Sequence, residues 1–504
     1  MKKIYSIAPY GLNGVLVELE ANLSRHLPKI IIVGLPDAAV SEAKERVWAA
    51  IENSGFSFPR QKVVINLAPA QIRKEGGAYD LPIAIAILVA NGDLKEVEHD
   101  AAFIGELSLN GDLKAIPGVL VMVASLKEMG FKKVFLPATS TKEASVVEGI
   151  NVFPVKNLFE LAEHLSNKTT IKPVVFGNFV ASKTNNLVDM ADIKGQAQAK
   201  RVLEIAAAGG HNVLMVGPPG AGKTLLAKAF LSILPEVTSQ EALETSKIYS
   251  LAGLLSEDKP IIDNRIVRSP HHSASVSSII GGGSWPKPGE ISLAHNNVLF
   301  LDEILEFPRQ VLEALRQPLE DKVITVSRVK GSLNFPANFI LLATANPCPC
   351  GFLTDKDRVC QCSSNDIKNY QKRLSGPVLD RIDLHLLLDK VDNHDLIANN
   401  FTLESSAQIA SRIARARQIQ RQRFQSYNFN LNDDIDNKLI RKICAVSDSG
   451  SAILSQASKN LNLSARAYFK ILKVARTIAD LEDRDNIADK HILEALQYRA
   501  KIFD

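Results

Sequence analysis

The chain has 504 residues, of which 46% are hydrophobic and 23% charged, and its formal net charge is +4. This composition is close to the globular average and excludes a wholly disordered or fibrous chain, and the length predicts about three domains, each with its own core. So small a net charge does not establish a nucleic-acid partner, and local clusters of charge must carry that argument.

The N-terminal run MKKIYSIAPYGLNG has no apolar core and no small-residue cleavage site, so we expect no secretory signal. The longest apolar run, residues 81–90, is too short for a bilayer, which takes about 20 residues. We therefore expect a cytoplasmic protein without a membrane partner. Four of the five cysteines fall within residues 348–362, which favours a metal site or chance over a disulfide framework.

Residues 1–165 alternate β-rich runs with helical patterns, which predicts an α/β or α+β domain. The expected strands lie at 15–20, 29–35, 62–69, 133–138 and 150–155, and the expected helices at 38–55 and 118–130. Residues 166–186 are polar without a sustained period, so they are interpreted as a linker.

A second α/β domain is expected over 187–390, because the apolar runs at 212–217, 297–303 and 339–346 are typical of buried parallel strands. From 391 to 504 the pattern is helical, which predicts an all-α lid or bundle. Its helices are expected at 405–424, 436–446, 464–482 and 489–499.

The motif GPPGAGKT fits the phosphate-binding pattern G-x-x-x-x-G-K-[ST] between an expected strand and an expected helix. Its glycines let backbone N–H groups surround phosphates, its lysine supplies positive charge to the β and γ phosphates, and its threonine offers a hydroxyl to Mg²⁺. We predict an ATP and Mg²⁺ site formed by Gly217, Pro218, Pro219, Gly220, Ala221, Gly222, Lys223 and Thr224.

Asp302 and Glu303 end the apolar strand NVLFLDE, where a buried acid pair needs a cation or hydrogen-bond partners. We expect Asp302 to hold the Mg²⁺ shell and Glu303 to polarise the attacking water. The next strand ends at Asn346, a neutral group suited to positioning water and the γ-phosphate.

In these segments the chain resembles the AAA+ ATPases, and the following roles are what that resemblance implies. Asn346 matches sensor 1, Arg381 in SGPVLDRIDLH matches the arginine finger that enters a neighbouring subunit's site, and Arg466 in NLSARAYFKILKVAR matches sensor 2. For either arginine alone, the alternative is a solvated helix charge. Ile193 and Gln196 match the segment beside the adenine.

The strings SPHHSASVSSIIGGGSWPKPGEISLAHNNVLFLDEILEF, NPCPCGF, RLSGPVLDRIDLH and LSARAYFKILKVARTIADL are similar to the ComM/YifB family of magnesium-chelatase-like AAA+ proteins. The resemblance covers essentially the whole chain. It implies a homo-hexameric ring ATPase, and in the ComM members a branch-migration helicase of natural transformation. The expected partners are single-stranded and branched DNA and other recombination proteins.

The N-terminal region also resembles the Lon protease domain, through KVVINLAPAQIRKEGGAYDLPIAIAIL and GELSLNGDLKAIPGVLVMVASLKEMGFKKVFLPA. That domain needs a serine activated by a lysine. Ala78 stands at the serine position and Leu120 at the lysine position, so we expect a scaffold without peptidase activity, similar to that of the RadA recombination ATPase. The expected fold class is α/β, an AAA+ P-loop ATPase core with a helical lid, preceded by a catalytically dead, Lon-protease-like or ChlI-type α+β domain.

Three segments are candidates for DNA contact. Residues 321–339 predict a β-hairpin, and in related ring motors such a hairpin points into the pore, which makes Arg328 and Lys330 candidate phosphate contacts. The loop GGGSWPKPGE presents Trp285 and Lys287, which suits stacking on unpaired bases, or else its tryptophan is buried in its own domain. The arginines of residues 412–423 form a solvated face, or bind DNA or the next subunit.

Cys348, Cys350, Cys360 and Cys362 are candidate Zn²⁺ ligands in an insertion at 347–363, with packed free thiols as the alternative. Two rival functions remain. One is a chelatase-like motor that remodels a protein partner, because the ATPase motifs are shared. The other, a Lon-like ATP-dependent protease, is disfavoured by Ala78 and Leu120.

Overall fold

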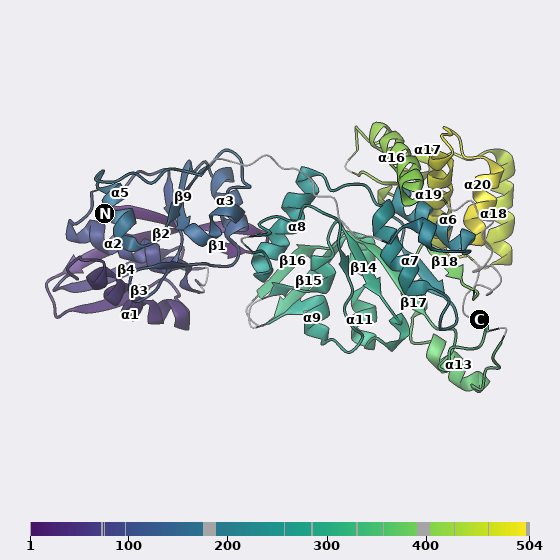
Figure 1. Ribbon diagram of the computed structural model, residues 1–504, viewed down its shortest axis with the longest axis horizontal. Coiled ribbons are helices and arrows are strands. Elements are labelled where there is room, and N and C mark those ends of the chain that lie inside the picture. Colours follow the sequence, from purple (N-terminus) through teal and green to yellow (C-terminus); the bar gives the residue numbers. More distant parts are fainter. Residues whose placement is uncertain are drawn as a thin grey trace. The chain divides into compact units, whose positions relative to one another are not determined.

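The computed structural model describes residues 2–499 apart from 72, 73, 75, 96, 175–187, 257, 284, 285, 329, 330, 356, 391–403, 428 and 462. The chain divides into two compact units (Figure 1). Unit 1 comprises residues 1–180 and 238–263, and unit 2 comprises residues 181–237 and 264–504. Residues 238–263 fall within the segment predicted as the ATPase domain and group by their contacts with unit 1. The domain boundaries expected at 165 and 390 stay predictions.

Unit 1 is built on a seven-stranded mixed sheet of order β3-β4-β2-β1-β5-β8-β9, in which β2 runs antiparallel to both neighbours. The strands are β1 (Lys3–Tyr10), β2 (Asn13–Ser24), β3 (Lys29–Val33), β4 (Lys62–Ala68), β5 (Ala101–Phe103), β8 (Lys133–Pro137) and β9 (Asn151–Val155), with a small hairpin of β6 (Glu106–Leu107) and β7 (Leu113–Lys114). The five strands expected in this region are confirmed.

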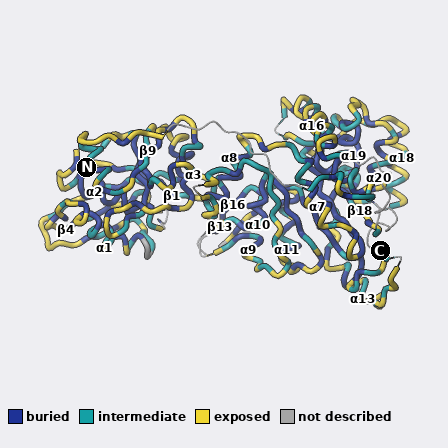
Figure 2. Tube along the Cα trace, viewed as in Figure 1, coloured by how far each residue is buried: buried dark blue, intermediate teal, exposed yellow. Residues whose placement is uncertain are grey.

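The helices of unit 1 are α1 (Ala38–Asn53), α2 (Asp80–Asn91), α3 (Val119–Glu128), α4 (Thr141–Ala144), α5 (Leu158–Leu165) and α8 (Ser239–Ala252). α1 begins where the Asp37 side chain accepts a hydrogen bond from the Val40 N–H, at 2.7 Å. The longest apolar run of the sequence lies in α2, and its residues 81–89 are buried, so this run is a core helix (Figure 2).

Unit 2 contains a five-stranded parallel sheet of order β11-β14-β17-β10-β18. Its strands are β11 (Val267–Arg268), β14 (Val298–Leu301), β17 (Ile340–Ala345), β10 (Val213–Val216) and β18 (Leu384–Leu387). The three expected strands are β10, β14 and β17, and they are buried almost throughout because both faces of a parallel sheet are covered. Their carboxyl ends meet at one edge, where the register pairs Val216 with Ala345 and Leu301 with Ala343.

The remaining elements before residue 390 are mostly short helices and hairpins. The helices are α6 (Ala197–Gly209), α7 (Lys223–Phe230), α9 (Val276–Ile280), α10 (Glu290–Leu293), α11 (Arg309–Ala314), α12 (Pro318–Asp321), α13 (Ser364–Gln371) and α14 (Gly376–Leu379). The hairpins pair β12 (Gly281–Gly282) with β13 (Lys287–Pro288) and β15 (Val323–Arg328) with β16 (Gly331–Pro336). The hairpin expected within 321–339 is confirmed.

The C-terminal part is helical as expected, with α16 (Ser406–Arg423), α17 (Ile440–Ile443), α18 (Asp448–Asn460), α19 (Ala465–Leu481) and α20 (Asp489–Gln497). A capping box of Ser405 and Gln408 starts α16. α16 and α19 pack against α6, so these helices and the sheet share one continuous apolar core. α18 was not among the expected helices, since its sequence DSGSAILSQASKN has only a short apolar stripe.

Candidate nucleotide site

The phosphate-binding loop lies between β10 and α7. Gly220 and Gly222 both have φ of +83°, a conformation that side chains rarely adopt. A Cβ added at Gly217 would lie 2.6 Å from the carbonyl oxygen of Leu388, so only glycine fits there. This backbone brings the loop to the first turn of α7, where N–H groups are free to face phosphate oxygens.

Lys223 is the first residue of α7 and reaches back over the loop. Its Nζ donates to the carbonyl oxygen of Gly217 and, at 2.9 Å, to Oδ1 of Asn346. Burial lowers the pKa of Lys223, while Asp302 and Glu303 act in the opposite direction. The predicted phosphate-binding lysine and the predicted sensor 1 are therefore in direct contact.

Asp302 and Glu303 follow β14 beside the end of β17. Thr344 Oγ1 donates to Oδ1 of Asp302 at 2.5 Å, and the Glu303 N–H donates to Oγ1 of Thr344 at 3.0 Å. Glu303 has a φ of +52°, an unfavourable backbone for a non-glycine residue that often marks functional positions. Thr344, which the sequence analysis did not single out, thus fixes the acidic pair in place.

The oxygens needed for a magnesium ion lie together at this edge. Oγ1 of Thr224 is 3.3 Å from Oδ2 of Asp302, so the hydroxyl and the carboxylate predicted as ligands share one place. Mg²⁺ prefers a few carboxylate or hydroxyl oxygens, with substrate phosphates completing its shell. The residues present fit that ion.

The candidate adenine contacts have structural partners. The Gln196 side chain donates to the carbonyl oxygens of Asp389, at 2.7 Å, and Ala221, at 3.4 Å, and so links the end of β18 to the phosphate-binding loop. Ile193 is 5% exposed within the core of unit 2. Their role in base recognition stays a prediction.

Arg381 and Arg466 meet on one carboxylate. Arg381 follows α14 and donates through Nε and Nη2 to Oε2 of Glu320, while Nη2 of Arg466 donates to Oε1 of the same side chain. Within the described residues, the side chains of Lys223 and Thr224 form hydrogen bonds with neither arginine. Glu320 was missed because it is 61 residues from one arginine and 146 from the other, and no local pattern marks it.

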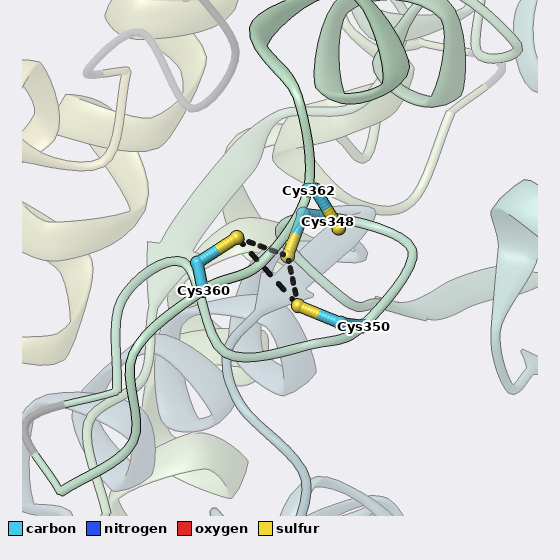
Figure 3. A group of neighbouring side chains, drawn as sticks. All are labelled: Cys348, Cys350, Cys360 and Cys362. Carbon is cyan, nitrogen blue, oxygen red and sulfur yellow. Dashed lines mark hydrogen bonds between the residues drawn. The ribbon is translucent and has the colours of Figure 1, made fainter.

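The four candidate zinc ligands converge (Figure 3). Sγ of Cys348 lies 3.4 Å from Sγ of Cys350 and 3.6 Å from Sγ of Cys360, and all four sulfurs lie within 4.8 Å of one another. Tetrahedral Zn²⁺ with bonds of about 2.3 Å separates its sulfurs by roughly 3.8 Å. The cluster therefore has the donor set and the compactness that Zn²⁺ requires.

The cysteine insertion lies against the phosphate-binding loop. Gly351 has a φ of +83°, and a Cβ added there would come within 2.8 Å of Cδ of Pro219 and 3.9 Å of Cγ of Asn346. A zinc ion bound by the four cysteines would therefore also fix the backbone that lies beside Asn346.

The candidate DNA contacts are only partly described. Trp285 and Lys330 lie outside the described residues, and of Arg328 the backbone alone is described, at the end of β15. Lys287 is exposed on β13.

Three arginines of α16 have partners within unit 2. Arg412 binds Glu204 and Glu404, Arg417 donates to the carbonyl oxygen of Ala207, and Arg423 pairs with Asp480. The remaining two arginines of this stretch, Arg415 and Arg421, are exposed. Most arginines of this stretch therefore bind groups within unit 2 and do not form a free basic face.

A second group of potential ligands, formed by His211, Asp383 and Asp433, is fully buried in unit 2. Its carboxylates already have cationic partners, since Lys470 lies 2.5 Å from Asp383 and Lys322 lies 2.7 Å from Asp433. Ammonium groups thus balance the charge that a metal ion would otherwise neutralise.

In unit 1 the two positions that correspond to a serine–lysine pair are apolar. Ala78 is 7% exposed and Leu120 is fully buried, and both belong to one hydrophobic cluster. The N–H of Leu120 donates at 3.0 Å to Oε1 of Glu143, which also accepts from Oγ of Ser250 on α8. Burial raises the pKa of Glu143, against the effect of these hydrogen bonds.

These features define the class of the protein, which is a P-loop nucleotide-binding protein built on a parallel sheet, with a mixed α/β unit before it. Among the described residues, no helix combines the length and the apolar character that crossing a membrane takes.

Comparison with known proteins narrows the class to a family. Residues 189–396 match the family described as "Magnesium chelatase, subunit ChlI", residues 19–140 match "Subunit ChlI of Mg-chelatase", and residues 403–499 match "Magnesium chelatase, subunit ChlI C-terminal". The chain is 41% identical over 507 residues to competence protein ComM of Haemophilus influenzae, covering 99% of this chain and 97% of that protein. It is 40% identical over 500 residues to YifB of Escherichia coli, covering 99% and 96%.

The chain belongs to the ComM/YifB family of magnesium-chelatase-like AAA+ proteins, as its sequence strings predicted. Shorter matches link it to DNA repair protein RadA of Aquifex aeolicus, 31% identical over 120 residues, and to the archaeal Lon protease of Thermococcus kodakarensis, 25% identical over 160 residues. These cover 24% and 30% of this chain.

Proposed function

We propose that the protein is an ATP-driven DNA translocase that promotes branch migration of recombination intermediates, acting as a homo-hexameric ring. The observation that carries the proposal is the convergence of Lys223, Asn346, Thr224 and Asp302 at the carboxyl edge of the unit 2 sheet. Full-length similarity to a competence protein supports the link to DNA uptake and recombination.

In this proposal each residue of the site has one task. Lys223 binds the β and γ phosphates, Asn346 holds the lysine and orients the γ-phosphate, and Glu303 orients and polarises the attacking water. Mg²⁺, held by Thr224 and Asp302, would neutralise charge on the phosphate oxygens when bound. Thr344 keeps Asp302 and the Glu303 backbone in place, which positions both acids before the nucleotide binds.

Catalysis is completed between copies. Arg381 would enter the site of a neighbouring subunit, and a finger of this kind raises turnover by about 10³ to 10⁵-fold. The isolated chain should therefore hydrolyse ATP poorly. DNA would be held by the hairpin of β15 and β16, through Arg328 and Lys330, and by the loop of Trp285 and Lys287.

Unit 1 serves as a scaffold without peptidase activity in this proposal. Neither the methyl group of Ala78 nor the isobutyl group of Leu120 can attack a carbonyl or accept a proton. Incubation of the protein with casein, ATP and Mg²⁺ should yield no fragments, whereas ATP-dependent degradation would restore the protease alternative.

The remaining alternative, a chelatase-like motor acting on a protein partner, shares the ATPase site, so the test must involve DNA. ATP hydrolysis is measured at low salt with and without single-stranded and forked DNA. Stimulation by DNA is expected of a translocase, and a rate that no DNA substrate changes would favour the protein-remodelling motor.

A further inference from the structure

A single carboxylate accepts hydrogen bonds from both arginines that are predicted to act on nucleotide. Glu320 lies on the short helix α12, and its two carboxylate oxygens divide between Arg381 and Arg466. Burial opposes ionisation of Glu320, but the two guanidinium groups outweigh it and lower its pKa. The carboxylate is therefore charged at neutral pH and neutralises part of the positive charge beside it.

Arg381, the predicted finger residue, donates three of its five N–H groups in this arrangement. Nη1 of Arg381 donates to the carbonyl oxygen of Pro377 at 2.6 Å, and its other two nitrogens donate to Glu320. Its side chain is only 9% exposed, whereas that of Arg466 is 40% exposed. Because the Arg381 side chain is held against Glu320 with so little of its surface exposed, it must leave Glu320 to extend into the site of a neighbouring copy.

The arginines border a cavity with a volume of about 520 Å³. Its charged lining consists of five cationic side chains, those of Lys322, Arg381, Arg466, Lys470 and Lys473, and four acidic ones, those of Glu320, Asp433, Asp434 and Asp436. That volume is within the range of about 300 to 1,000 Å³ typical of small-ligand sites. A triphosphate carries more negative charge than one carboxylate and can therefore compete for the two guanidinium groups.

The segment that carries Glu320 is tied to the predicted DNA hairpin. Gln317 at the start of α12 bonds with Thr325 of β15, its Nε2 lying 3.0 Å from Oγ1, and the Ala337 N–H donates to the carbonyl oxygen of Lys322 at 2.8 Å. On its other side Lys322 pairs with Asp433. Movement of the hairpin would consequently move α12 and its carboxylate relative to the arginines.

We propose that Glu320 is a lock that stores Arg381 and Arg466 in an inactive state and releases them when the triphosphate of a neighbouring copy enters the cavity. DNA on the hairpin favours release by shifting α12. The inference rests on the proposed function, because it takes Arg381 to act on a second copy's nucleotide, and it adds Arg466 to that site because both arginines bind Glu320.

The test compares steady-state ATP hydrolysis, with and without forked DNA, for the wild type, Glu320→Gln, Arg381→Ala and the double variant. Glu320→Gln keeps the side-chain shape and removes the charge. It should raise the DNA-free rate about three- to tenfold, the gain expected when a partly exposed ion pair is lost. Its stimulation by DNA should shrink in proportion. The double variant should show no gain, because the released group is absent.

Glu313→Gln is the matched control, because Glu313 on α11 forms an exposed ion pair with Arg316 and lines no part of the cavity. It should leave both rates unchanged. Binding of a fluorescent ATP analogue, measured for every variant, shows that the fold and the nucleotide site are intact. A Glu320→Gln variant that binds nucleotide with an unchanged or lowered DNA-free rate would overturn the lock.

The two proposals fail in different ways. If DNA does not stimulate the wild type while Glu320→Gln still raises the DNA-free rate, the lock stands and the DNA function fails. If Arg381→Ala hydrolyses ATP at the wild-type rate, the action of the finger on a second copy fails, and the lock fails with it.

Discussion

The candidate nucleotide site of unit 2 has polar side chains at its key positions, whereas the interior of unit 1 has apolar side chains where a protease would have its catalytic pair. In unit 2 Lys223, Asp302 and Asn346 each have a polar partner at hydrogen-bond distance. In unit 1 the corresponding positions of a serine–lysine pair, Ala78 and Leu120, belong to an apolar cluster. The half-exposed polar groups of unit 2 are held in place by partners yet remain open to a ligand, as the predicted nucleotide site requires, whereas the buried side chains of unit 1 serve packing.

The largest expected effect tests the polar side of this comparison. Lys223→Ala removes the cation that contacts Asn346 and is predicted to bind the phosphates, so ATP turnover should fall by about 10³-fold, or about 4 kcal/mol in the barrier. Lys228→Ala, on the exposed face of the same helix, should leave turnover unchanged. Both rates are measured in a phosphate-release assay. Equal rates for the two variants would contradict the assignment of Lys223 to the nucleotide site.

The apolar side is tested by stability. Leu120→Ala removes a fully buried side chain and should lower the free energy of unfolding by about 3 kcal/mol, without loss of nucleotide binding. Leu109→Ala makes the same change at a side chain that is 56% exposed, and should cost less than about 0.5 kcal/mol. Urea denaturation of both variants checks this, and similar costs would show that position 120 is not part of the core.

The next prediction concerns zinc in the cysteine segment beside the candidate nucleotide site and its effect on stability. Zinc analysis of protein prepared without chelator should give about one ion per chain, and Cys350→Ser should abolish it and lower the melting temperature by about 5 °C. Cys444→Ala changes a buried cysteine outside the cluster and should keep the zinc. If the wild type contains no zinc and has the same melting temperature as Cys350→Ser, packed free thiols are favoured instead.

A smaller effect concerns pH. Burial, together with Arg499, lowers the pKa of His385 to about 3, whereas the unfolded chain should titrate near 6.5. The unfolded state therefore binds more protons between these values, and stability should fall as the pH drops below about 6.5, by about 1.4 kcal/mol per pH unit.

His385→Gln should reduce that slope, although burial also lowers the pKa of His211, which keeps its own contribution. His26→Gln, at an exposed position, should leave the slope unchanged. Urea-unfolding midpoints at pH 4.5, 5.5 and 6.5 provide the measurement. A slope that is undiminished in His385→Gln would assign the proton uptake to other groups.

The smallest expected effect concerns DNA binding. If Arg328 makes one phosphate contact, Arg328→Ala should reduce the dependence of log K on log salt concentration by about 0.9 for duplex DNA. Arg415→Ala alters an exposed arginine on α16 and is the control that distinguishes DNA contact by the hairpin from DNA contact by that helix. An unchanged slope for Arg328→Ala would remove the hairpin from the proposed DNA path.

Much of the site was predictable because its signals are local. The phosphate-binding motif and the polar residues that end two apolar strands each occupy a short stretch, and parallel strands bring such ends to one edge. Thr344 and Glu320 were not predictable, because their partners are fixed by tertiary packing across 42 to 146 residues.

The assignment of residues 238–263 to unit 1 was also beyond the sequence. α8 has an ordinary capping box of Thr238 and Glu241, and nothing local distinguishes it from a helix of the ATPase core. Its place is set by contacts with residues far away in the sequence. One of them is the hydrogen bond that the Gly118 N–H donates to the carbonyl oxygen of Ser250, at 3.0 Å.

The central claim is that ATP hydrolysis in unit 2 drives movement of DNA junctions. Its most direct test is the conversion of a labelled three-stranded junction into its products by the wild type and by Lys223→Ala, with ATP and Mg²⁺. The proposal predicts ATP-dependent conversion by the wild type and none by the variant. A wild type that hydrolyses ATP yet leaves three- and four-stranded junctions unchanged, as the variant does, would contradict it.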